Sequence, residues 1–302
     1  MKKQLLLQLQ DICYSYEETS VALQNISVSI FSCEKIAVLG SNGAGKSTFF
    51  LTCNGVIRPS AGTIFYRGQE ILHKKQDLKQ LRRNVGIVFQ EPDQQLIAPT
   101  VESEISFGPM NLRLSTEEVR RRVDDAICAM NLEDMRRRQP HNLSGGEKKR
   151  LTIADVLAMQ PEILLFDEPS AFLDPSNTQL LESTLHQLSD SGMTLLISTH
   201  DMDFVWRWAE RVLVLHQGEI ILDSTPAYLF SRNDIIQAVG LRKPILFEVM
   251  EAMTTENPQS TEHLPVEQWA KTVEQFRTFI QNKSLCVPVL VNVKKTTPLS
   301  IL

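Results

Sequence analysis

The sequence predicts an α/β fold: a largely parallel sheet with an antiparallel β edge, an inserted α-helical subdomain and a small C-terminal extension. Short apolar runs alternate with helical segments, which is the pattern of a parallel sheet. The pattern becomes helical between about residues 92 and 160, and a polar stretch follows Met253. We therefore expect one domain over residues 1–245, which contains the helical insertion, and an extension over residues 246–302.

The first elements are predicted to be strands. Residues 4–31 alternate between apolar and polar side chains around a turn at Glu17–Thr19, as an antiparallel pair would. "KIAVLG" (Lys35–Gly40) is a short apolar run that ends in glycine, as a buried strand does. A helix-like segment follows from Lys46, so a strand, a glycine-rich turn and a helix succeed one another directly.

Two more buried strands and a hairpin are expected later in the chain. "ILLFD" (Ile163–Asp167) and "TLLIST" (Thr194–Thr199) are short apolar runs between helical stretches. "RVLVLHQGEIILD" has a turn dipeptide at Gln217–Gly218 between two apolar runs, which indicates a hairpin.

The inserted segment has the signature of a helix start. Ser115 and Glu118 have the spacing of a capping box ahead of "VRRRVDDAICAM". One face of that helix carries the apolar residues Val119, Val123, Ile127 and Met130. We expect a helical subdomain that packs on the α/β core along this face.

The C-terminal extension is predicted to hold one amphipathic helix. "TTENPQSTEH" (Thr254–His263) is a polar linker, and a helix is expected from Val266 to Ile280. Its apolar side carries Trp269, Val273, Phe276 and Ile280. "LCVPVLVNV" near the end is strand-like, and dimerisation is a role left open for the extension.

Composition narrows the class of protein. The net charge of -5 gives no support for wholesale binding of nucleic acid. The five cysteines form no CxxC pair, so neither a disulfide framework nor a zinc site is indicated, as in a reducing cytoplasm. No apolar run approaches the roughly 18 residues of a membrane helix, so a membrane role would be peripheral.

A glycine-rich stretch between the strand and helix of the first half carries the strongest chemical signal. "GSNGAGKST" fits the phosphate-loop pattern G-x-x-x-x-G-K-[ST] in the required context. Its glycines let backbone N–H groups converge on an anion at a helix start. Lys46 would reach the β- and γ-phosphates, and the Ser47 hydroxyl would bind Mg²⁺. The expected ATP-binding residues of this loop are Gly40, Ser41, Asn42, Gly43, Ala44, Gly45, Lys46, Ser47 and Thr48.

"ILLFDEPS" supplies two adjacent carboxylates at the end of a buried strand. Asp167 can hold Mg²⁺ through a water, and Glu168 can be the general base that polarises the attacking water. Adjacent carboxylates could also begin an ordinary loop. Together with a phosphate loop they indicate nucleotide hydrolysis.

"LSGGEKKR" (residues 143–150) is a second candidate for an anion-binding helix start, built from Ser144, Gly145 and Gly146. Two such helix starts and one phosphate loop are unusual for a self-contained kinase. They make sense if the second start binds the γ-phosphate held by another copy. His200 in "ISTHD" follows a strand and could contact the γ-phosphate, although a histidine there is often structural.

In this order, the motifs resemble those of the nucleotide-binding subunit of ABC transporters. The resemblance covers residues 1 to about 245 and implies a P-loop NTPase (RecA-like) core that hydrolyses ATP with Mg²⁺. It implies a head-to-tail dimer in which Ser144 and Gly146 bind the other copy's ATP. It also implies that Asp174 in "SAFLD" couples the two sites, and that Tyr16, rather than the alternative Tyr14, stacks on adenine.

The chain departs from that family's pattern at positions near these motifs. Glu147 stands where glutamine is commoner, and Ser170 stands where threonine is commoner. Phe172 occupies a position usually held by a smaller residue, and it puts bulk near the expected seam of the dimer. None of these changes removes a catalytic group.

"FQEPDQQLIAPT" (Phe89–Thr100) places amides between two prolines, which a polar surface loop would also tolerate. By the resemblance, Gln90 would bridge Mg²⁺ and a transmembrane partner. Pro92 allows a kinked start, Asp93 could cap a short turn, and Leu96 with Ile97 offers an apolar ledge. The expected interface with that partner consists of Pro92, Asp93, Gln94, Gln95, Leu96 and Ile97.

"PDQQL" in this segment resembles the corresponding segment of energy-coupling-factor (ECF) importers. The implied partners are an ECF-type transmembrane coupling subunit, a substrate-binding membrane component and a second copy or a paralogue, without nucleic acid. We expect a peripheral position on the cytoplasmic face of the cell membrane.

The transported substrate is indicated only by the resemblance of two longer sequence stretches to one branch of these importers. "IAPTVESEISFGPMNL" and "QPHNLSGGEKKR" resemble the cobalt/nickel importer branch, and a vitamin importer is the alternative. A soluble ABC ATPase that acts on nucleic acid or the ribosome is a more distant alternative, because such proteins usually carry two cassettes or long insertions.

Overall fold

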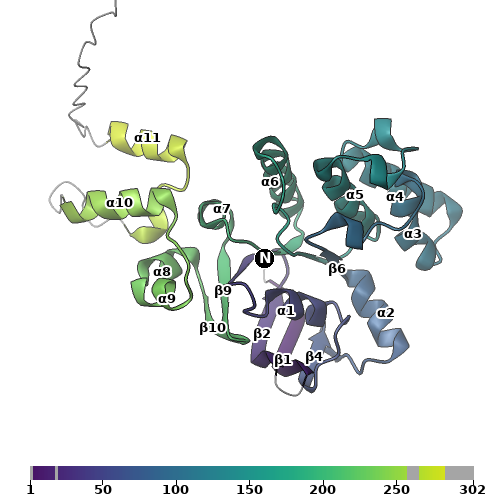
Figure 1. The fold of residues 1–302 in the computed structure, drawn as a ribbon, viewed down its shortest axis with the longest axis horizontal. Coiled ribbons are helices and arrows are strands. Elements are labelled where there is room, and N and C mark those ends of the chain that lie inside the picture. Colours follow the sequence, from purple (N-terminus) through teal and green to yellow (C-terminus); the bar gives the residue numbers. More distant parts are fainter. Residues whose placement is uncertain (1–2, 18–19, 257–264, 283–302) are drawn as a thin grey trace, which may run out of the picture. The chain divides into compact units, whose positions relative to one another are not determined.

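A computed structural model describes residues 3–17, 20–256 and 265–282. The chain forms two compact units, Met1–Pro244 and Ile245–Leu302, and each is described by itself. The first unit is mixed α/β and holds two sheets (Figure 1). The predicted fold class is confirmed.

The larger sheet has six strands in the order β10-β9-β3-β8-β7-β6. These strands are β10 (Glu219–Ser224), β9 (Arg211–His216), β3 (Lys35–Leu39), β8 (Thr194–Ser198), β7 (Ile163–Phe166) and β6 (Val85–Val88). All neighbouring pairs are parallel except β9 and β10, which form the expected hairpin. β7 and β8 are buried along their whole length, as their continuous apolar runs predict.

The smaller sheet is antiparallel, in the order β2-β1-β4-β5. It consists of β2 (Ser20–Phe31), β1 (Leu5–Glu17), β4 (Ala61–Tyr66) and β5 (Gln69–Glu70). The predicted pair over residues 4–31 is therefore extended by two strands. Its apolar face shares one core with the larger sheet and with Phe49 and Phe50 of α1 (Lys46–Cys53).

Helices flank the sheets of the first unit. They are α1, α2 (Lys75–Asn84), α6 (Pro175–Asp190), α7 (Met202–Trp208), α8 (Pro226–Ser231) and α9 (Asn233–Ala238). The small sheet is tied to the start of β7 by Glu162, whose carboxylate accepts hydrogen bonds from the Tyr66 hydroxyl at 2.6 Å and from Arg67 Nε at 3.0 Å. Within the described part of the chain, no helix combines the length and apolar character needed to cross a membrane.

The helical subdomain contains α3 (Val101–Asn111), α4 (Thr116–Ala129) and α5 (Gly145–Ala158), with single turns η1 (Pro92–Gln94), η2 (Glu133–Met135) and η3 (Pro140–Asn142). On the predicted apolar face of α4, Val123, Ile127 and Met130 are buried. Helix–helix packing along this face holds the subdomain together.

The expected capping box at the start of α4 is only half right. The Ser115 hydroxyl accepts a hydrogen bond from the Glu118 N–H at 3.2 Å, as a cap should. The Glu118 carboxylate instead accepts from the guanidinium groups of Arg121 and Arg122, because these cations lie one turn further along the helix. Complete capping boxes begin α3 and α5.

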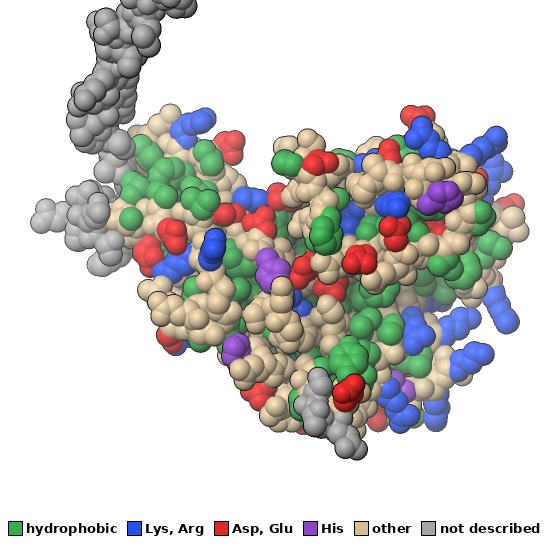
Figure 2. All heavy atoms as spheres, in the orientation of Figure 1, with side chains coloured by type: hydrophobic (Ala, Val, Ile, Leu, Met, Phe, Trp, Pro, Cys, Tyr) green, Lys and Arg blue, Asp and Glu red, His purple; other side chains and the backbone are tan. Residues whose placement is uncertain are grey.

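Basic side chains gather over α2, α3 and α4 in the view of Figure 2. In α4, Arg121 pairs with Glu118 and with Asp125 at 2.9 Å. Arg122 is buried and also donates to the Met159 carbonyl oxygen at 3.2 Å. Arg122 therefore joins α4 to the end of α5, whereas Arg121 pairs within α4.

The second unit differs from the predicted single helix. It contains α10 (Ile245–Glu256), a turn η4 (Val266–Gln268) and α11 (Val273–Asn282). Trp269 is extended and buried beside the Phe247 ring at 4.8 Å, whereas Val273 is exposed. The helix expected from Val266 thus begins at Val273, where the Thr272 hydroxyl accepts from the Gln275 N–H.

The predicted linker also begins later than expected. α10 continues to Glu256, so Thr254 is helical instead of part of a polar linker. The rest of that linker, residues 257–263, and the strand-like stretch "LCVPVLVNV" lie outside the described residues.

Gly62 and Gly68 offer a matched test of backbone packing in the small sheet. Both have left-handed φ values, +87° and +77°. A Cβ on Gly62 would collide with the carbonyl oxygens of Gln10 and Asp11, whereas a Cβ on Gly68 would meet nothing within 4 Å. We expect Gly62→Ala to lower the free energy of unfolding by roughly 3 kcal/mol and Gly68→Ala by about 1 kcal/mol. Equal losses in denaturant unfolding would contradict this difference.

Candidate functional site

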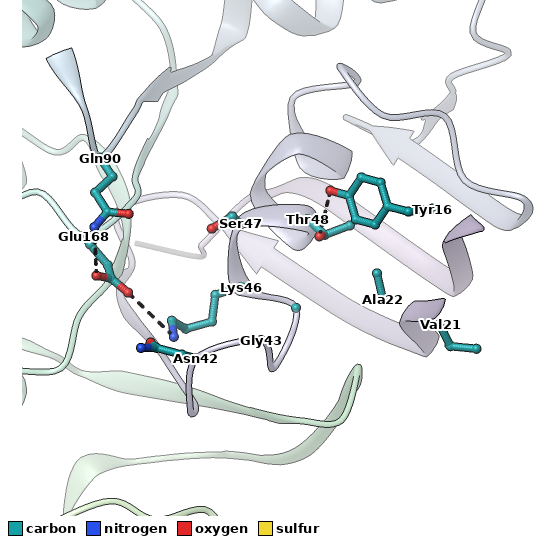
Figure 3. A pocket seen from close by; sticks show the side chains of 11 residues that line it. Tyr16, Val21, Ala22, Asn42, Gly43, Lys46, Ser47, Thr48, Gln90 and Glu168 are labelled. Atoms are coloured by element: carbon teal, nitrogen blue, oxygen red, sulfur yellow. Dashed lines mark hydrogen bonds and ion pairs between the residues drawn. The ribbon is translucent and has the colours of Figure 1, made fainter. Parts of the chain in front are cut away.

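A pocket of about 480 Å³ opens beside the loop between β3 and α1 (Figure 3). Its lining comes from segments that are far apart in the sequence. The lining residues are Tyr16, Val21, Ala22, Asn42, Gly43, Gly45, Lys46, Ser47, Thr48, Gln90 and Glu168. The structure therefore brings together much of the predicted phosphate loop with one predicted tyrosine, Gln90 and Glu168.

The phosphate loop (residues 40–48) has the backbone that its glycines allow. Gly43 and Gly45 take left-handed φ values of +81° and +104°, and a Cβ on Gly45 would lie 2.6 Å from the Ala22 carbonyl oxygen. No side chain caps α1 at Gly45, and the first turn has no acidic residue. Free N–H groups at a helix start attract anions, so this end of α1 suits a phosphate.

Lys46 places a buried cation inside the loop. Its Nζ donates to the carbonyl oxygens of Gly40 at 2.9 Å and Ser41 at 3.2 Å. It also lies 3.8 Å from Glu168 Oε1. Burial lowers the pKa of Lys46, and the carboxylates of Glu168 and Asp167 oppose that effect. Two carbonyl oxygens and one carboxylate therefore hold the ammonium at the pocket.

The two predicted carboxylates follow β7 and are ordered by Ser198 at the end of β8. The Ser198 hydroxyl donates to Asp167 Oδ1 at 2.7 Å and accepts from the Glu168 N–H at 2.8 Å. Asp167 is buried. Sequence reasoning missed Ser198, although a polar residue near the end of the apolar run "TLLIST" is a usable signal.

Glu168 is the side chain on which the other polar groups converge. Its φ of +43° is unusual for a residue other than glycine, and such backbone strain is often found at functional sites. Gln90 Nε2 donates to Glu168 Oε2 at 3.4 Å, and His200 Nε2 lies 3.0 Å from Oε1. With Lys46, groups from three other elements therefore meet at one carboxylate.

The two candidate tyrosines lie in different environments. Tyr14 is partly buried against the hydrophobic core, whereas Tyr16 is 57% exposed and lines the pocket. The Tyr16 hydroxyl shares a hydrogen bond with Thr48 Oγ1 at 3.1 Å. The rings of Tyr14 and Tyr16 pack edge to face, with their centroids 5.0 Å apart. Of the two rings, only that of Tyr16 lies at the pocket.

Ser144, Gly145 and Gly146 begin α5 and do not line this pocket. Ser144 and Gly145 are exposed, whereas Gly146 is buried so close to the Asn177 amide that a Cβ would collide with it. Glu147 closes a capping box with Ser144, and the Ser144 N–H holds the pKa of this carboxyl below its usual value. A carboxylate at this position therefore stabilises the helix start.

The segment "SAFLD" precedes α6. Asp174 caps that helix by accepting from the Asn177 N–H at 2.9 Å, which lowers the pKa of its carboxyl. Phe172 is 86% exposed with a φ of +63°. Its ring is thus presented to solvent by a backbone conformation that a smaller residue would adopt more easily.

The glutamine segment (residues 89–97) contains η1, and one expectation about it is wrong. Glu91, not Asp93, occupies the N-cap position, and its side chain makes no capping bond. The Asp93 carboxylate instead pairs with Lys148 of α5 at 2.7 Å, because that cation lies beside the turn. Ile97 is 72% exposed, and Leu96 is half-buried.

Gln95 points inward, although it was predicted to face a partner. Its Nε2 donates to the Thr152 carbonyl oxygen and to Asp155 Oδ2, both at 3.2 Å. Its Oε1 accepts from the Phe89 N–H at 3.4 Å. This amide therefore fastens the glutamine segment to α5.

Lys149 of α5 is a second inward contact that sequence reasoning missed. The side chain is only 2% exposed, and Nζ donates to the carbonyl oxygens of Phe89 at 2.9 Å and Gln90 at 2.7 Å. Burial lowers the pKa of Lys149 to about 8. The available signal was its place four and seven residues before the apolar Ile153 and Val156, on one helix face, but the basic run Lys148–Arg150 is also typical of a solvated face.

Comparison with known proteins identifies the family of this chain. The family model described as ABC transporter matches residues 23–171. An energy-coupling factor transporter ATP-binding protein of Methanococcus maripaludis is 44% identical, covering 83% of this chain and 91% of its own length. A protein of the same description from Methanospirillum hungatei is 42% identical over 86% of this chain, which spans 65% of that relative's length.

Solved structures show the same likeness. CbiO1 of Clostridium perfringens, described as part of the ABC transporter complex cbiONQ, superposes with a TM-score of 0.70 and 37% identity, covering 82% of this chain and 99% of that one. An ATP-binding cassette solved as a dimer with ADP and Pi bound has a TM-score of 0.66 and 26% identity, covering 73% and 99%.

The Asp155 carboxyl, held by Gln95, gives a pH-dependent prediction. Burial raises its pKa from 3.8 to about 7. The folded chain therefore keeps a proton that the unfolded chain loses between pH 4 and 7, and the stability contributed by this group is lost as pH rises through 7. We expect Asp155→Asn to raise Tm by roughly 4 °C at pH 8, and much less at pH 5.

The control is Asp125→Asn, which alters an exposed ion pair on α4. Its effect on the free energy of unfolding should stay within about 0.5 kcal/mol at both pH values. A Tm difference for Asp155→Asn that is the same at pH 5 and pH 8 would contradict the assignment.

Proposed function

Because this chain belongs to the ABC transporter ATP-binding proteins of the energy-coupling-factor type, which hydrolyse ATP, we propose that it is the motor subunit of a membrane importer. It works as a dimer that sandwiches ATP and drives a transmembrane partner. The observation that carries the proposal is one pocket that joins an uncapped helix start, the Lys46 ammonium and the Glu168 carboxylate.

The residues of the pocket suit ATP. The uncapped N–H groups of α1 and the Lys46 ammonium would bind the β- and γ-phosphates, which are polyanions. Tyr16 is exposed at the pocket and offers a ring face for adenine. The rest of the phosphate loop supplies the remaining backbone contacts.

Hard oxygen ligands suitable for Mg²⁺ occur in and beside the pocket. Ser47 and Gln90 line it, and the carboxylate of Asp167 is oriented by Ser198. Such hydroxyl, amide and carboxylate oxygens fit Mg²⁺, and these three residues would hold it. Bound Mg²⁺ would neutralise charge on the β- and γ-phosphate oxygens.

Hydrolysis requires a base for the attacking water, and Glu168 is the group in position for it. Its carboxylate is 22% exposed and faces Gln90, His200 and Lys46. We assign to Gln90 the orientation of the water and to His200 a contact with the γ-phosphate. Catalysis would consist of positioning and charge stabilisation, without a covalent enzyme intermediate.

Two copies would complete two such sites. Ser144 and Gly145 are exposed at the start of α5 and lie outside the pocket of their own chain. Together with Gly146 they form a helix N-terminus that can bind the γ-phosphate held by a second copy. Asp174 would link the two sites. A related cassette solved as a dimer supports this arrangement.

The membrane partner would bind the glutamine segment. Ile97 presents an apolar side chain beside Gln94 and Asp93, which are also exposed, and an incoming helix could cover them. The partner is an ECF-type transmembrane coupling subunit with a substrate-binding component, so the chain would sit at the cytoplasmic face of the membrane. The inward direction of Gln95 removes that side chain from the interface proposed here.

The proposed cargo is cobalt or nickel ions. Support comes from the likeness of "IAPTVESEISFGPMNL" to that importer branch and from the similarity to cbiO1 of the cbiONQ complex. Uptake of radiolabelled Co²⁺ and Ni²⁺ by vesicles that contain the complex with its membrane partners tests this. ATP-driven uptake of a vitamin instead of either metal would overturn the cargo and leave the motor role intact.

Glu168→Gln tests the catalytic base. The substitution keeps size and polarity but removes the basic oxygen, so kcat should fall by about 10²- to 10⁴-fold while ATP still binds. Size-exclusion chromatography with ATP should then show a trapped dimer. Glu117→Gln, on the exposed side of α4, serves as the control and should leave kcat unchanged. Near-normal hydrolysis by Glu168→Gln would disprove the assignment.

Ile97→Asp tests the proposed interface. A carboxylate at this exposed apolar position would have to be desolvated on docking, so ATP-driven uptake by the reconstituted complex should fall at least tenfold, about 1.4 kcal/mol or more. The ATPase of the isolated chain should not change. Val56→Asp changes an apolar residue that is 51% exposed outside the segment and should spare both activities. Loss of the isolated ATPase in Ile97→Asp would indicate a catalytic role instead.

A further inference from the structure

The glutamine segment and α5 are joined by a ladder of polar contacts along one side of the helix. Lys148 pairs with Asp93, and further along the helix Thr152 and Asp155 accept from Gln95. Between these contacts lies Lys149, whose ammonium bonds backbone instead of a side chain. The segment that carries Gln90 therefore follows α5 closely.

The Lys149 ammonium is unusual because it binds the carbonyl oxygens of two consecutive residues. Its Nζ donates to two successive carbonyl oxygens, those of Phe89 and Gln90. In an extended strand successive residues face opposite ways, so one cation can hold both carbonyls only where the chain leaves the strand. Lys149 therefore defines the bend at which the chain leaves β6, directly before the Gln90 side chain.

The energetics of Lys149 point away from a role in stability. Among the described residues, no carboxylate forms an ion pair with its ammonium, and the Asp167 carboxylate, which opposes the lowering of the pKa of Lys149, acts on it without such a contact. Burying a cation without a paired anion is unfavourable, and an apolar side chain of similar length would avoid that cost but would leave two carbonyl oxygens without this donor. A buried lysine here makes sense if its two charge-assisted hydrogen bonds do something that packing alone does not.

We propose that Lys149 is a positioning residue for hydrolysis: by holding the Phe89 and Gln90 carbonyl oxygens, it places the Gln90 amide against Glu168. The planar peptides on either side of Gln90 restrict the direction of its side chain once both carbonyls are fixed. That side chain then reaches Glu168 Oε2 at 3.4 Å. Lys149 itself does not line the ATP pocket, so it acts only through Gln90.

The same bond connects two parts of the proposed dimer. α5 begins at the residues proposed to bind the second copy's ATP, and Lys149 lies in the second turn of that helix. Its ammonium holds Gln90 of its own copy's site. A movement of α5 towards a second copy would therefore be transmitted to Gln90. This inference rests on the proposed ATPase function.

A double-mutant cycle tests the proposal. Steady-state ATP hydrolysis is measured for the full-length wild type, Lys149→Met, Gln90→Ala and the double variant. A displaced amide should lower kcat of Lys149→Met roughly 10- to 100-fold, with KM for ATP changed less than about threefold. Because Lys149 acts through Gln90, the double variant should hydrolyse ATP no more slowly than Gln90→Ala alone.

Further variants separate positioning from structure. Lys149→Met should unfold within about 4 °C of wild type, because relief from burying a cation offsets the loss of the donor to the Phe89 and Gln90 carbonyl oxygens. Lys149→Arg keeps a cation with several donors and should recover part of the lost kcat. Lys35→Met removes a lysine that pairs with Asp190 at 3.6 Å and should leave kcat unchanged.

The outcomes are distinct. The proposal would be overturned if the kcat losses of the two single variants multiplied in the double variant. It would also be overturned if Lys149→Met raised KM for ATP more than tenfold, or if Gln90→Ala kept a normal kcat. If Lys149→Met fails to fold, the cycle is run with Lys149→Gln, and failure of both to fold would show a structural role instead. Absence of ATPase activity in the wild type would refute the proposed function itself, which is a different result.

Discussion

The parallel register of four neighbouring strands is the constraint on which the site depends. Val38 pairs with Ser198, Phe166 pairs with Ile197, and Val88 pairs with Phe166, so β3, β8, β7 and β6 end at nearly the same level. The segment after each strand is therefore delivered to one edge of the sheet, as is usual for ligand sites in parallel sheets. These four segments carry the phosphate loop, His200, the paired carboxylates and Gln90. The chemistry of the pocket is a consequence of this alignment.

Charge balance at that edge explains why the pocket tolerates buried ionic groups. Lys46 lies between carbonyl oxygens and the Glu168 carboxylate, and Asp167 is bonded to Ser198. Each buried charge has donors or acceptors of opposite character within reach, which reduces the cost of desolvation. Lys149 likewise donates to backbone carbonyl oxygens, but no carboxylate pairs with it directly among the described residues. The proposed role of this costly cation in placing the Gln90 side chain accounts for its position beside the backbone of that residue.

The sequence predicted most of the fold and of the pocket, because those parts depend on local patterns. A stretch of a few residues is enough to recognise each buried strand, the glycine-rich turn and the carboxylates after β7. The rest depends on contacts between distant segments. Ser198, Lys149 and the inward Gln95 act through partners 30 to 60 residues away, which no local pattern reveals. The helix expected from Val266 failed for the same reason, since burial of Trp269 against Phe247 overrides periodicity.

Within a few residues of the glutamine segment, some side chains face the protein interior and others face solvent. Gln90 and Gln95 point inward, towards Glu168 and α5, whereas Gln94 and Ile97 point outward. Glu104 of α3 is buried and accepts hydrogen bonds from the N–H groups of Ile97 and Ala98. The backbone at the C-terminal end of the segment is therefore also held by a buried side chain. A surface whose backbone is held at both ends by buried polar bonds is expected to resist deformation. In the proposed complex a docked partner would therefore be displaced together with α5, and the polar contacts between α5 and the glutamine segment would connect the nucleotide edge of the sheet to the outer surface.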